Sequence, residues 1–253
     1  MAGDSRSLLD FALAGRPRMP RESTETGQPP RWPYPGRSPV RMMFLLATIG
    51  SFGCAAAPRL VDSNSVTGFA LYRSGQLSGA ELTQLCGQGV EELLVLDGGA
   101  INRECRMLRE QCPGLRVRYN FAQNEKQPVS QEFLGAFDKW IEEGKAEGRK
   151  LAYRCRRGWH RAGRLTAYYQ IRFMGASVQE AIDEMQARGR FMWWYPRLDP
   201  QVEALGEWVA RETCSGGAEF CPQPVDPTSE GLQADGSFPL DACSGQSDSE
   251  VAR

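Results

Sequence analysis

One stretch of the sequence combines a nucleophilic side chain with groups that bind anions. Cys155 and Arg161 are separated by five residues, and Gly158 lies between them. The apolar run 151–153 precedes this stretch and a helix-like segment begins near Arg161, so we expect a strand, a tight turn and a helix. Backbone N–H groups and the positive end of the helix dipole lower a thiol pKa from about 8.5 to roughly 3.5–7.5. Cys155 is therefore predicted to be a thiolate nucleophile.

The same loop is suited to bind a phosphate group. The N–H groups of the turn and the helix start form an anion cradle, and the planar guanidinium of Arg161 can hold two phosphate oxygens. Together with Cys155 these groups predict phosphoryl transfer to the cysteine. The neighbouring Arg156 and Arg157 either add positive charge for a polyanionic substrate or form a solvated basic face.

This loop resembles the Cys-x5-Arg signature of the cysteine-dependent phosphatases of the tyrosine and dual-specificity class. It is most similar to the plant-and-fungi atypical dual-specificity phosphatases, whose loop reads Cys-x-Arg-Gly-Lys-His-Arg-Thr-Gly. The matching residues are Cys155, Arg157, Gly158, His160, Arg161 and Gly163. The resemblance covers about residues 65–212, and the segments 72–75 and 124–128 are also similar to that family.

The resemblance implies a phosphocysteine intermediate on Cys155, no cofactor and no metal. It implies a phosphorylated substrate, either a phosphoprotein or a small polyphosphate such as an inositol pyrophosphate. The residues that the resemblance assigns to the phosphate site are Arg156, Arg157, Gly158, Trp159, His160 and Arg161. For His160, holding the loop, facing the substrate and simple packing all remain open.

Three positions depart from the family pattern. Arg154 stands where the family has His, Ala162 where most members have Thr or Ser, and Trp159 where the family has Lys. Arg154 still brings positive charge next to Cys155. The alternative function is therefore a catalytically weak or inactive phosphoanion-binding lipoprotein, a pseudophosphatase. A rhodanese-type sulfurtransferase also uses a cysteine loop, but it does not require Arg161.

A general acid must protonate the leaving oxygen within hydrogen-bond reach. The segment 120–128 occupies the place of the family's acid-bearing loop, and Glu125 is its single carboxylate. Glu125 is therefore the candidate general acid, and an exposed loop glutamate is the alternative. Asp97, at the end of a predicted strand, is a second candidate. A weak acid would suit a good leaving group, as in a phosphoanhydride.

Short apolar runs alternate with amphipathic stretches through the middle of the chain. Strands are predicted at 69–72, 93–96, 115–119 and 151–153, and helices at 78–86, 102–112 and 130–147. Ser177 opens a capping box for a further helix, and Asp199 is expected to cap the last one. This alternation predicts a three-layer α/β fold, with a mainly parallel central sheet flanked by helices. The family resemblance implies a protein tyrosine phosphatase-like version, whose active site lies beyond the strand C-termini.

The sequence divides into five parts. Residues 1–40 are expected to be disordered or to reflect a misassigned start, and 41–54 resemble a bacterial lipoprotein signal ending at Cys54, the candidate lipidated residue. A buried strand or helix with an ordinary cysteine is the alternative for 41–54. We expect a linker at 55–65 and the phosphatase-like domain at 66–212. The Gly-, Pro-, Ser- and Cys-rich tail 213–253 is expected to trail without a core of its own.

Charge and cysteine usage bear on the compartment and partners. The net charge of −1 gives no nucleic-acid or polybasic membrane signal, so membrane contact is expected only through a lipid on Cys54. The chain is expected to be a bacterial outer-membrane lipoprotein facing the periplasm, and the alternative location is the cytoplasm. The chain has eight cysteines. In the periplasm the six other than Cys54 and Cys155 should form disulfides, for example Cys105–Cys112 or Cys214–Cys221. A single histidine and no Cys-x2-Cys pair make a zinc site improbable.

Overall fold

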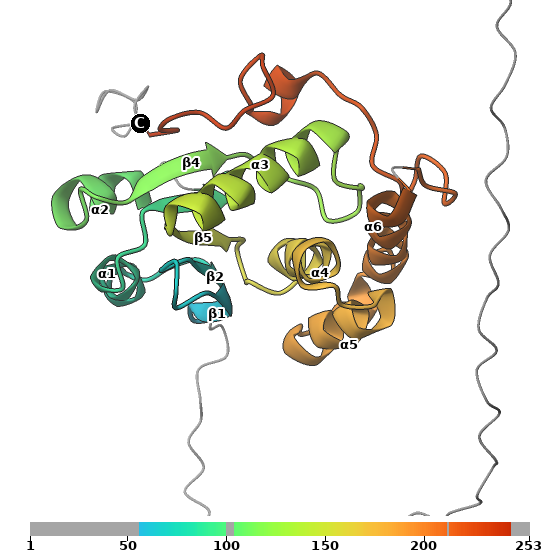
Figure 1. The fold of residues 1–253 in the computed structure, drawn as a ribbon, viewed down its shortest axis with the longest axis horizontal. Helices are drawn as coiled ribbons and strands as arrows, with labels where there is room; N and C mark the ends of the chain where they lie inside the picture. The colour runs from blue at the N-terminus through green and yellow to red at the C-terminus, as the bar shows by residue number, and fades with distance from the viewer. Residues whose placement is uncertain (1–55, 100–103, 212, 244–253) are drawn as a thin grey trace, which may run out of the picture. The chain divides into compact units, whose positions relative to one another are not determined.

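Five strands form one central sheet in which four strands are parallel (Figure 1). The computed structural model describes residues 56–99, 104–211 and 213–243. The predicted signal segment and Cys54 lie outside these residues. The strand order is β1-β2-β5-β3-β4, and only β1 runs antiparallel to its neighbour. The strands are β1 (Arg59–Ser63), β2 (Ala70–Ser74), β3 (Glu92–Val95), β4 (Arg116–Asn120) and β5 (Lys150–Arg154).

Helices cover both faces of the sheet. They are α1 (Gly79–Gly87), α2 (Glu104–Gln111), α3 (Gln131–Glu147), α4 (Arg161–Met174), α5 (Val178–Arg188) and α6 (Leu198–Arg211), with the short 3₁₀ turns η1 (Met192–Trp194) and η2 (Pro227–Glu230). Within the described part of the chain, every helix is too short or too polar to cross a lipid bilayer.

The three layers follow from which side chains each strand turns to each face. Leu93 and Ala152 pack with α1 and α2, whereas Leu94 and Tyr153 belong to the larger cluster beneath α3 and α4. Successive side chains of a strand point to opposite faces, so both faces of the central strands must be apolar. The register between β3 and β4 shifts by one residue at Arg118, as in a β-bulge. The predicted three-layer, mainly parallel α/β fold is confirmed.

Of the two predicted helix caps, Ser177 is confirmed and Asp199 is not. Ser78 and Ser177 each form a complete capping box, and the Ser130 hydroxyl accepts a bond from the Phe133 amide. The predicted start of α6 was wrong, because a cap at Asp199 would begin the helix at residue 200, two residues later than the structure does. That helix begins at Leu198, so Asp199 lies in its first turn instead of capping it.

The predicted linker 55–65 contains strand β1, which is a correction to the domain boundary. β1 pairs with β2 along the edge of the sheet, and the Tyr169 hydroxyl from α4 donates a hydrogen bond to Asp62 in β1. Leu60 is 54% exposed, and Val61 is half-buried against the core. Because β1 is a short edge strand with little buried surface, its sequence lacks the apolar run that marks the central strands.

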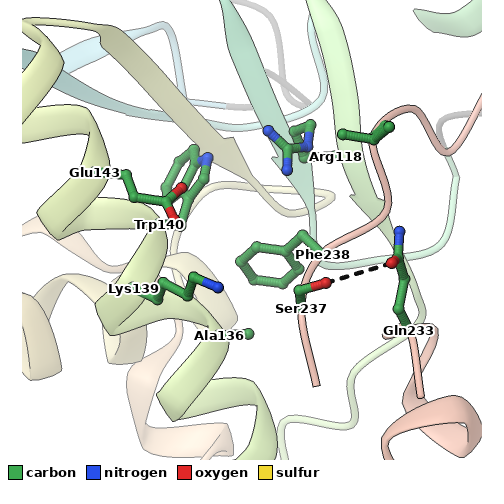
Figure 2. A pocket seen from close by; sticks show the side chains of 9 residues that line it. Arg118, Ala136, Lys139, Trp140, Glu143, Gln233, Ser237 and Phe238 are labelled. Carbon is green, nitrogen blue, oxygen red and sulfur yellow. Dashed lines mark hydrogen bonds between the residues drawn. The ribbon is translucent and has the colours of Figure 1, made fainter. Parts of the chain in front are cut away.

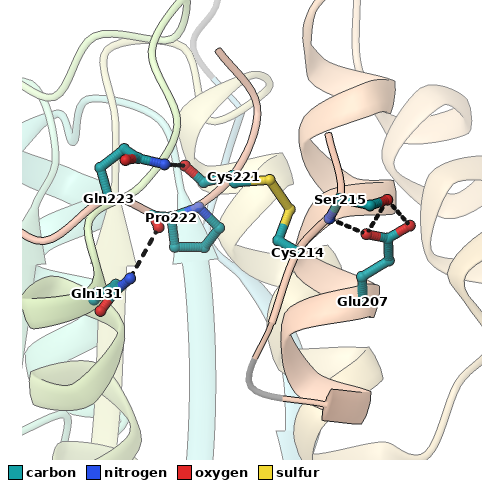
Figure 3. Close-up of a disulfide and its surroundings, with 7 residues drawn as sticks. All are labelled: Gln131, Glu207, Cys214, Ser215, Cys221, Pro222 and Gln223. Carbon is teal, nitrogen blue, oxygen red and sulfur yellow. Dashed lines mark hydrogen bonds between the residues drawn. A yellow bond between two sulfur atoms is a disulfide. The ribbon is translucent and has the colours of Figure 1, made fainter. Parts of the chain in front are cut away.

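The tail from residue 213 packs on the domain instead of trailing from it. Leu232 and Phe238 are buried in the main core cluster, so the tail has no core of its own but completes this one. The predicted Cys214–Cys221 disulfide is present just after α6 (Figure 3). Beside it, Ser215 bonds to Glu207 in α6, and Gln131 in α3 donates to the Pro222 carbonyl.

The other predicted disulfide, Cys105–Cys112, was wrong. Cys105 bonds to Cys243 near the end of the tail, and Cys112 bonds to Cys86 in α1. Cys105 and Cys112 lie seven positions apart across α2, and each faces a different neighbouring segment. The two bonds therefore fasten α2 to the tail on one side and to α1 on the other.

A cavity of about 310 Å³ lies between α3, β4 and the tail (Figure 2). Its lining includes Phe238, Trp140 and the charged side chains Arg118, Lys139 and Glu143. The Arg118 guanidinium is bound to Glu92 and to the Pro239 carbonyl, so it fastens the tail to the sheet. None of the lining residues belongs to the loop between β5 and α4, so this cavity is distinct from the candidate active site.

Candidate active site

Cys155 lies in the tight loop that joins β5 to α4, as predicted. The residue is 2% exposed, and its sulfur accepts a hydrogen bond of 3.2 Å from the Gly158 amide. The helix after the loop begins at Arg161, which confirms the strand–turn–helix pattern. Among the described cysteines, Cys155 is the one that forms no disulfide. Its sulfur therefore lies at the start of a 14-residue helix with at least one backbone donor directed at it.

Gly158 makes the tight course of this loop sterically possible. Its φ is +75°, a conformation that residues with a Cβ rarely adopt. A Cβ at this position would lie 2.6 Å from the Gly75 amide nitrogen and 2.8 Å from the Ser74 carbonyl oxygen. The loop therefore needs glycine both for its backbone angle and for its close approach to the end of β2.

Neighbouring backbone segments hold two carbonyl groups of the loop. The Arg157 carbonyl accepts a bond of 3.0 Å from the Ala56 amide, and the Arg156 carbonyl accepts one of 3.2 Å from the Gln76 amide. Two oxygens that would repel an anion are thus bound to donors outside the loop. Ala56 was not predicted to contact the site, because no sequence pattern links it to residue 157.

Arg161 is held at the same end of the sheet by backbone carbonyls. Its Nη1 donates to the carbonyl oxygens of Leu96 and Gln123, each at 3.1 Å, and its Nε lies 3.7 Å from a Glu125 carboxylate oxygen. Leu96 follows β3, and Gln123 lies in the loop after β4. The guanidinium is therefore positioned by the C-terminal ends of two strands, while 17% of the side chain remains exposed.

The structure brings Glu125 to this site and does not bring Asp97. The contact with Arg161 places the Glu125 carboxylate at the edge of the loop region. Asp97 instead accepts bonds from Arg154 at 2.5 Å and from the Gly99 amide at 3.1 Å. Glu125 is therefore the available carboxylate of the two candidates.

Two residues that the sequence did not single out anchor the segment that carries Glu125. Arg164, which is 1% exposed, donates to the Gln127 carbonyl at 2.6 Å and to the Gln201 side chain. Gln201 in turn donates to the Glu125 carbonyl at 3.4 Å. Burial, with a smaller contribution from the nearby Arg161, lowers the pKa of Arg164 to about 10, so it stays charged at neutral pH. Arg164 and Gln201 therefore hold in place the segment that carries Glu125.

Arg154, which stands where the resembling phosphatases have histidine, directs its guanidinium to two carboxylates. The side chain is completely buried, with Nη1 2.5 Å from Asp97 and Nη2 2.6 Å from Glu104. Two carboxylates therefore surround this guanidinium. Burial raises the pKa of Glu104, and this effect exceeds the opposing attraction of Arg154. Arg154 links β5 to the end of β3 and to α2.

His160 has a packing role in the structure. Its ring stacks on Tyr195 with centroids 3.7 Å apart, and its Nε2 donates to the Arg190 carbonyl at 3.0 Å. Burial lowers the pKa of His160, so the ring is neutral at pH 7. Of the three interpretations left open, these contacts favour packing that holds the loop against the segment before α6.

The other predicted phosphate-site residues divide into a buried ring and exposed charges. Trp159 is 6% exposed, and the guanidinium groups of Arg157 and Arg190 each lie 5.6 Å from its ring centroid. Arg156 and Arg157 are exposed. Arg190 was not predicted, although the aromatic run that follows it could have indicated a contact with Trp159.

No protein-family model and no curated protein matches the chain. Several solved structures are similar. TpbA from P. aeruginosa has 20% identity and a TM-score of 0.43, over 60% of this chain and 96% of that one. A putative phosphatase from Shewanella putrefaciens CN-32 has 17% identity and a TM-score of 0.44, over 64% and 93% of the two chains.

A third similar structure is the catalytic core of the PP-IP phosphatase SIW14 from S. cerevisiae. It has 16% identity and a TM-score of 0.41, and the match covers 56% of this chain and 80% of that one. TpbA is a tyrosine phosphatase.

Proposed function

We propose that this protein is a cysteine-dependent phosphatase of the tyrosine and dual-specificity type. One observation carries the proposal: the Cys155 sulfur accepts the Gly158 amide in a loop that leads directly into α4, whose first residue is Arg161. The positive end of the α4 dipole and the N–H donors of the loop attract negative charge to this position. The same donors bind the oxygens of a phosphate group.

The reaction proceeds in two steps. The Cys155 thiolate attacks phosphorus while the bond from phosphorus to the leaving oxygen breaks, and Glu125 donates a proton to that oxygen. Water then attacks the phosphocysteine, the Glu125 carboxylate takes a proton from it, and the sulfur leaves as thiolate. Arg161 and the loop amides bind the equatorial oxygens, whose charge distribution changes most in the transition state.

We also propose a substrate class, a lipid anchor and a compartment for this protein. The substrate is a phosphorylated protein or a small polyphosphate, and the resemblance of the loop motif to that of the plant-and-fungi atypical dual-specificity phosphatases supports this choice. We further propose that Cys54 carries lipid and that the domain faces an oxidising compartment such as the periplasm. Three disulfides in the described part of the chain support that compartment, because such bonds are rare in the cytosol. Mass spectrometry of the native protein would detect a lipid on Cys54.

Hydrolysis of p-nitrophenyl phosphate by the wild type and by Cys155→Ser tests the chemistry. We expect the serine variant to lose at least about 10³-fold in kcat, because its hydroxyl is a far weaker nucleophile than a thiolate. Mass spectrometry of acid-quenched wild type should find a phosphoryl group on Cys155. Equal phosphate binding by both proteins without turnover by either would instead support the pseudophosphatase.

The role of Glu125 is tested by Glu125→Gln on two substrates. An aryl phosphate with a good leaving group needs little protonation, whereas an alkyl phosphate needs a proton in the transition state. The variant should therefore lose about 10²-fold or more on the alkyl phosphate and much less on the aryl phosphate. Equal losses on both would assign Glu125 to positioning Arg161, which it contacts at 3.7 Å.

A further inference from the structure

Three large apolar side chains are exposed in the segment between α5 and α6. Phe191 is 48% exposed, Trp193 is 72% exposed and Trp194 is 61% exposed. We call these three residues the aromatic rim. Neighbouring exposed apolar side chains of this size usually mark a binding surface, whereas single exposed ones are normal.

Local contacts hold the aromatic rim in its exposed position. Phe191 has a φ of +57°, a strained conformation for an aromatic residue, and its carbonyl accepts a bond of 3.0 Å from the Trp194 amide. The rings of Phe191 and Trp194 stack 5.3 Å apart, and the two tryptophan rings lie 4.7 Å apart. Strain of this kind persists where the surrounding structure enforces it, often at binding sites.

The aromatic rim adjoins the phosphate-binding loop. The Phe191 ring lies 6.2 Å from the ring of Trp159, which is four residues after Cys155. The Arg190 carbonyl, immediately before the rim, accepts the bond from His160 in the same loop. A molecule that contacts the rim would therefore also lie close to the loop that carries Cys155.

Uncompensated positive charge surrounds this junction. Arg156, Arg157 and Arg190 are exposed, and none forms an ion pair with a carboxylate in the described part of the chain. Arg188 and Arg197, which flank the rim on either side, are paired with Glu184 and Glu219. Three arginines thus remain free to bind anions next to the exposed aromatic rings.

The described chain also begins at this junction. The Ala56 amide is bound to the Arg157 carbonyl, and the Ala56 carbonyl accepts the Gly75 amide at 2.6 Å. The 55 residues before Ala56 contain the apolar run 42–53, followed by Cys54. Cys54, the candidate lipidated residue, is two positions before Ala56 in the sequence.

We propose that the aromatic rim and the three arginines dock the domain on a membrane surface, and that the substrate phosphate is carried by a lipid headgroup. The substrate class rests on the phosphatase function proposed above. Tryptophan is favoured at the membrane interface, because the apolar part of its ring can contact the acyl chains while its N–H group contacts water and headgroups. Arginines beside them bind the phosphates of anionic lipids. The rim inserts between headgroups while the cradle faces a lipid phosphate.

Binding to vesicles tests the docking surface without requiring catalysis. The full chain, prepared without lipid on Cys54, is mixed with sucrose-loaded vesicles of phosphatidylcholine and phosphatidylglycerol and centrifuged. Trp193→Ala/Trp194→Ala should bind at least about tenfold more weakly, because two large apolar groups then stay out of the membrane. Arg190→Gln should lose about fivefold, and only when phosphatidylglycerol is present. Leu240→Ala, at a site 73% exposed, is the matched control and should bind as the wild type does.

Fluorescence quenching separates the rim from membrane binding by the N-terminal segment. Vesicles with brominated acyl chains quench a tryptophan only when its ring enters the bilayer. Wild-type emission should be quenched more than that of Trp193→Phe/Trp194→Phe, in which other tryptophans remain. Equal quenching of the two proteins, or no vesicle binding by the wild type, overturns the docking proposal. A dimer that the alanine variant loses, with no vesicle binding, would instead assign the rim to a second copy of the chain.

Activity tests the lipid substrate separately. Two substrates are compared, long-chain phosphatidic acid in vesicles and dibutanoyl phosphatidic acid in solution. Both carry the same phosphate monoester, but only the first is part of a membrane. Wild type should prefer the vesicle form, and the preference should fall at least about tenfold in Trp193→Ala/Trp194→Ala. Equal rates on the two forms, or no hydrolysis of either by an enzyme that cleaves p-nitrophenyl phosphate, overturn the lipid substrate. If Cys155→Ser matches the wild type on p-nitrophenyl phosphate, the phosphatase function fails while the vesicle-binding result still stands.

Discussion

Gly158 determines whether the loop between β5 and α4 can form. Gly158→Ala forces a Cβ into a φ of +75° and to within 2.6 Å of the Gly75 nitrogen. We expect a loss of about 1–3 kcal/mol in the free energy of unfolding. Because the loop must move, kcat on p-nitrophenyl phosphate should fall about 100-fold. Urea unfolding and steady-state kinetics measure the two effects.

The matched control is Gly87→Ala at the end of α1. Its Cβ would meet no atom within 4 Å, and its φ is not positive. Alanine is a better helix former than glycine by about 0.8–1.0 kcal/mol, so this variant should be as stable as the wild type or more stable. Similar losses in both variants would mean that Gly158 is not special to the loop.

His160 predicts how stability changes near neutral pH. Burial lowers its folded-state pKa, so the unfolded chain binds the proton more tightly. The free energy of unfolding should therefore rise with pH between the lowered pKa and about 6.5, by at most about 1.4 kcal/mol per pH unit. It should show no further His160 contribution above that interval.

Urea unfolding at a series of pH values measures this slope. His160 is the single histidine of the chain, so His160→Gln should remove the slope while keeping a donor for the Arg190 carbonyl. If the variant keeps the wild-type slope, the proton binds elsewhere and His160 is not buried as neutral imidazole.

At this scale the sequence predicts the residues whose spacing is local. Cys155, Gly158 and Arg161 could be identified because seven consecutive residues carry nucleophile, turn and clamp. The partners of Arg154 could not be identified this way. Asp97 and Glu104 lie about fifty residues earlier in the chain and meet Arg154 only after β3, β5 and α2 assemble.

At the scale of elements, the buried ion pairs of Arg154 fasten α2 to the sheet. Arg154→Met leaves Asp97 and Glu104 without their guanidinium, and Glu104 is 0% exposed. We expect a loss of about 3–5 kcal/mol in the free energy of unfolding, which urea titration measures. Much of that loss comes from the uncompensated carboxylates, so adding Glu104→Gln should recover part of it.

A double-mutant cycle measures whether Glu104 and Arg154 interact. Arg116→Met, at an exposed position of β4, controls for the loss of a surface arginine and should stay within about 0.5 kcal/mol of the wild type. If Glu104→Gln and Arg154→Met destabilise additively, the two side chains do not interact, and this ion pair does not hold α2 to the sheet.

The elements that the sequence predicts are those with a strong apolar pattern. The four parallel strands and the capping box of α5 were identified, because a buried strand is apolar on both faces and a capping box has a fixed spacing. β1 was missed because an edge strand buries little surface. The contact between the segment before α6 and His160 was missed because stacking on Tyr195 follows no periodicity.

For the whole molecule, the disulfides differ in the length of chain that each closes. Cys105–Cys243 spans 138 residues, whereas Cys214–Cys221 spans 7. Restricting the unfolded chain stabilises the fold more for the longer loop. Replacing both cysteines by alanine should therefore cost about 5 kcal/mol for the first bond and about 2 kcal/mol for the second.

Thermal and urea unfolding of the two double-alanine variants under non-reducing conditions measure this difference. The short-loop variant is the control for removing any disulfide from the tail. Equal losses would show that the bonds act through native packing and not through the unfolded chain. The pairing itself could not be predicted, because Cys86, Cys105 and Cys112 are brought to their partners only by packing of α1, α2 and the tail.

The hydrogen bonds of Ala56 have a mechanical consequence. Its amide and carbonyl groups bind the Arg157 carbonyl and the Gly75 amide, and β1 follows three residues later. Tension applied to the chain before Ala56 would therefore load the catalytic loop first, and only afterwards the ladder between β1 and β2. Two hydrogen bonds yield at a lower force than a sheet does. In a chain anchored through the lipid proposed on Cys54, pulling on this end should therefore slow the proposed phosphatase turnover before any strand separates.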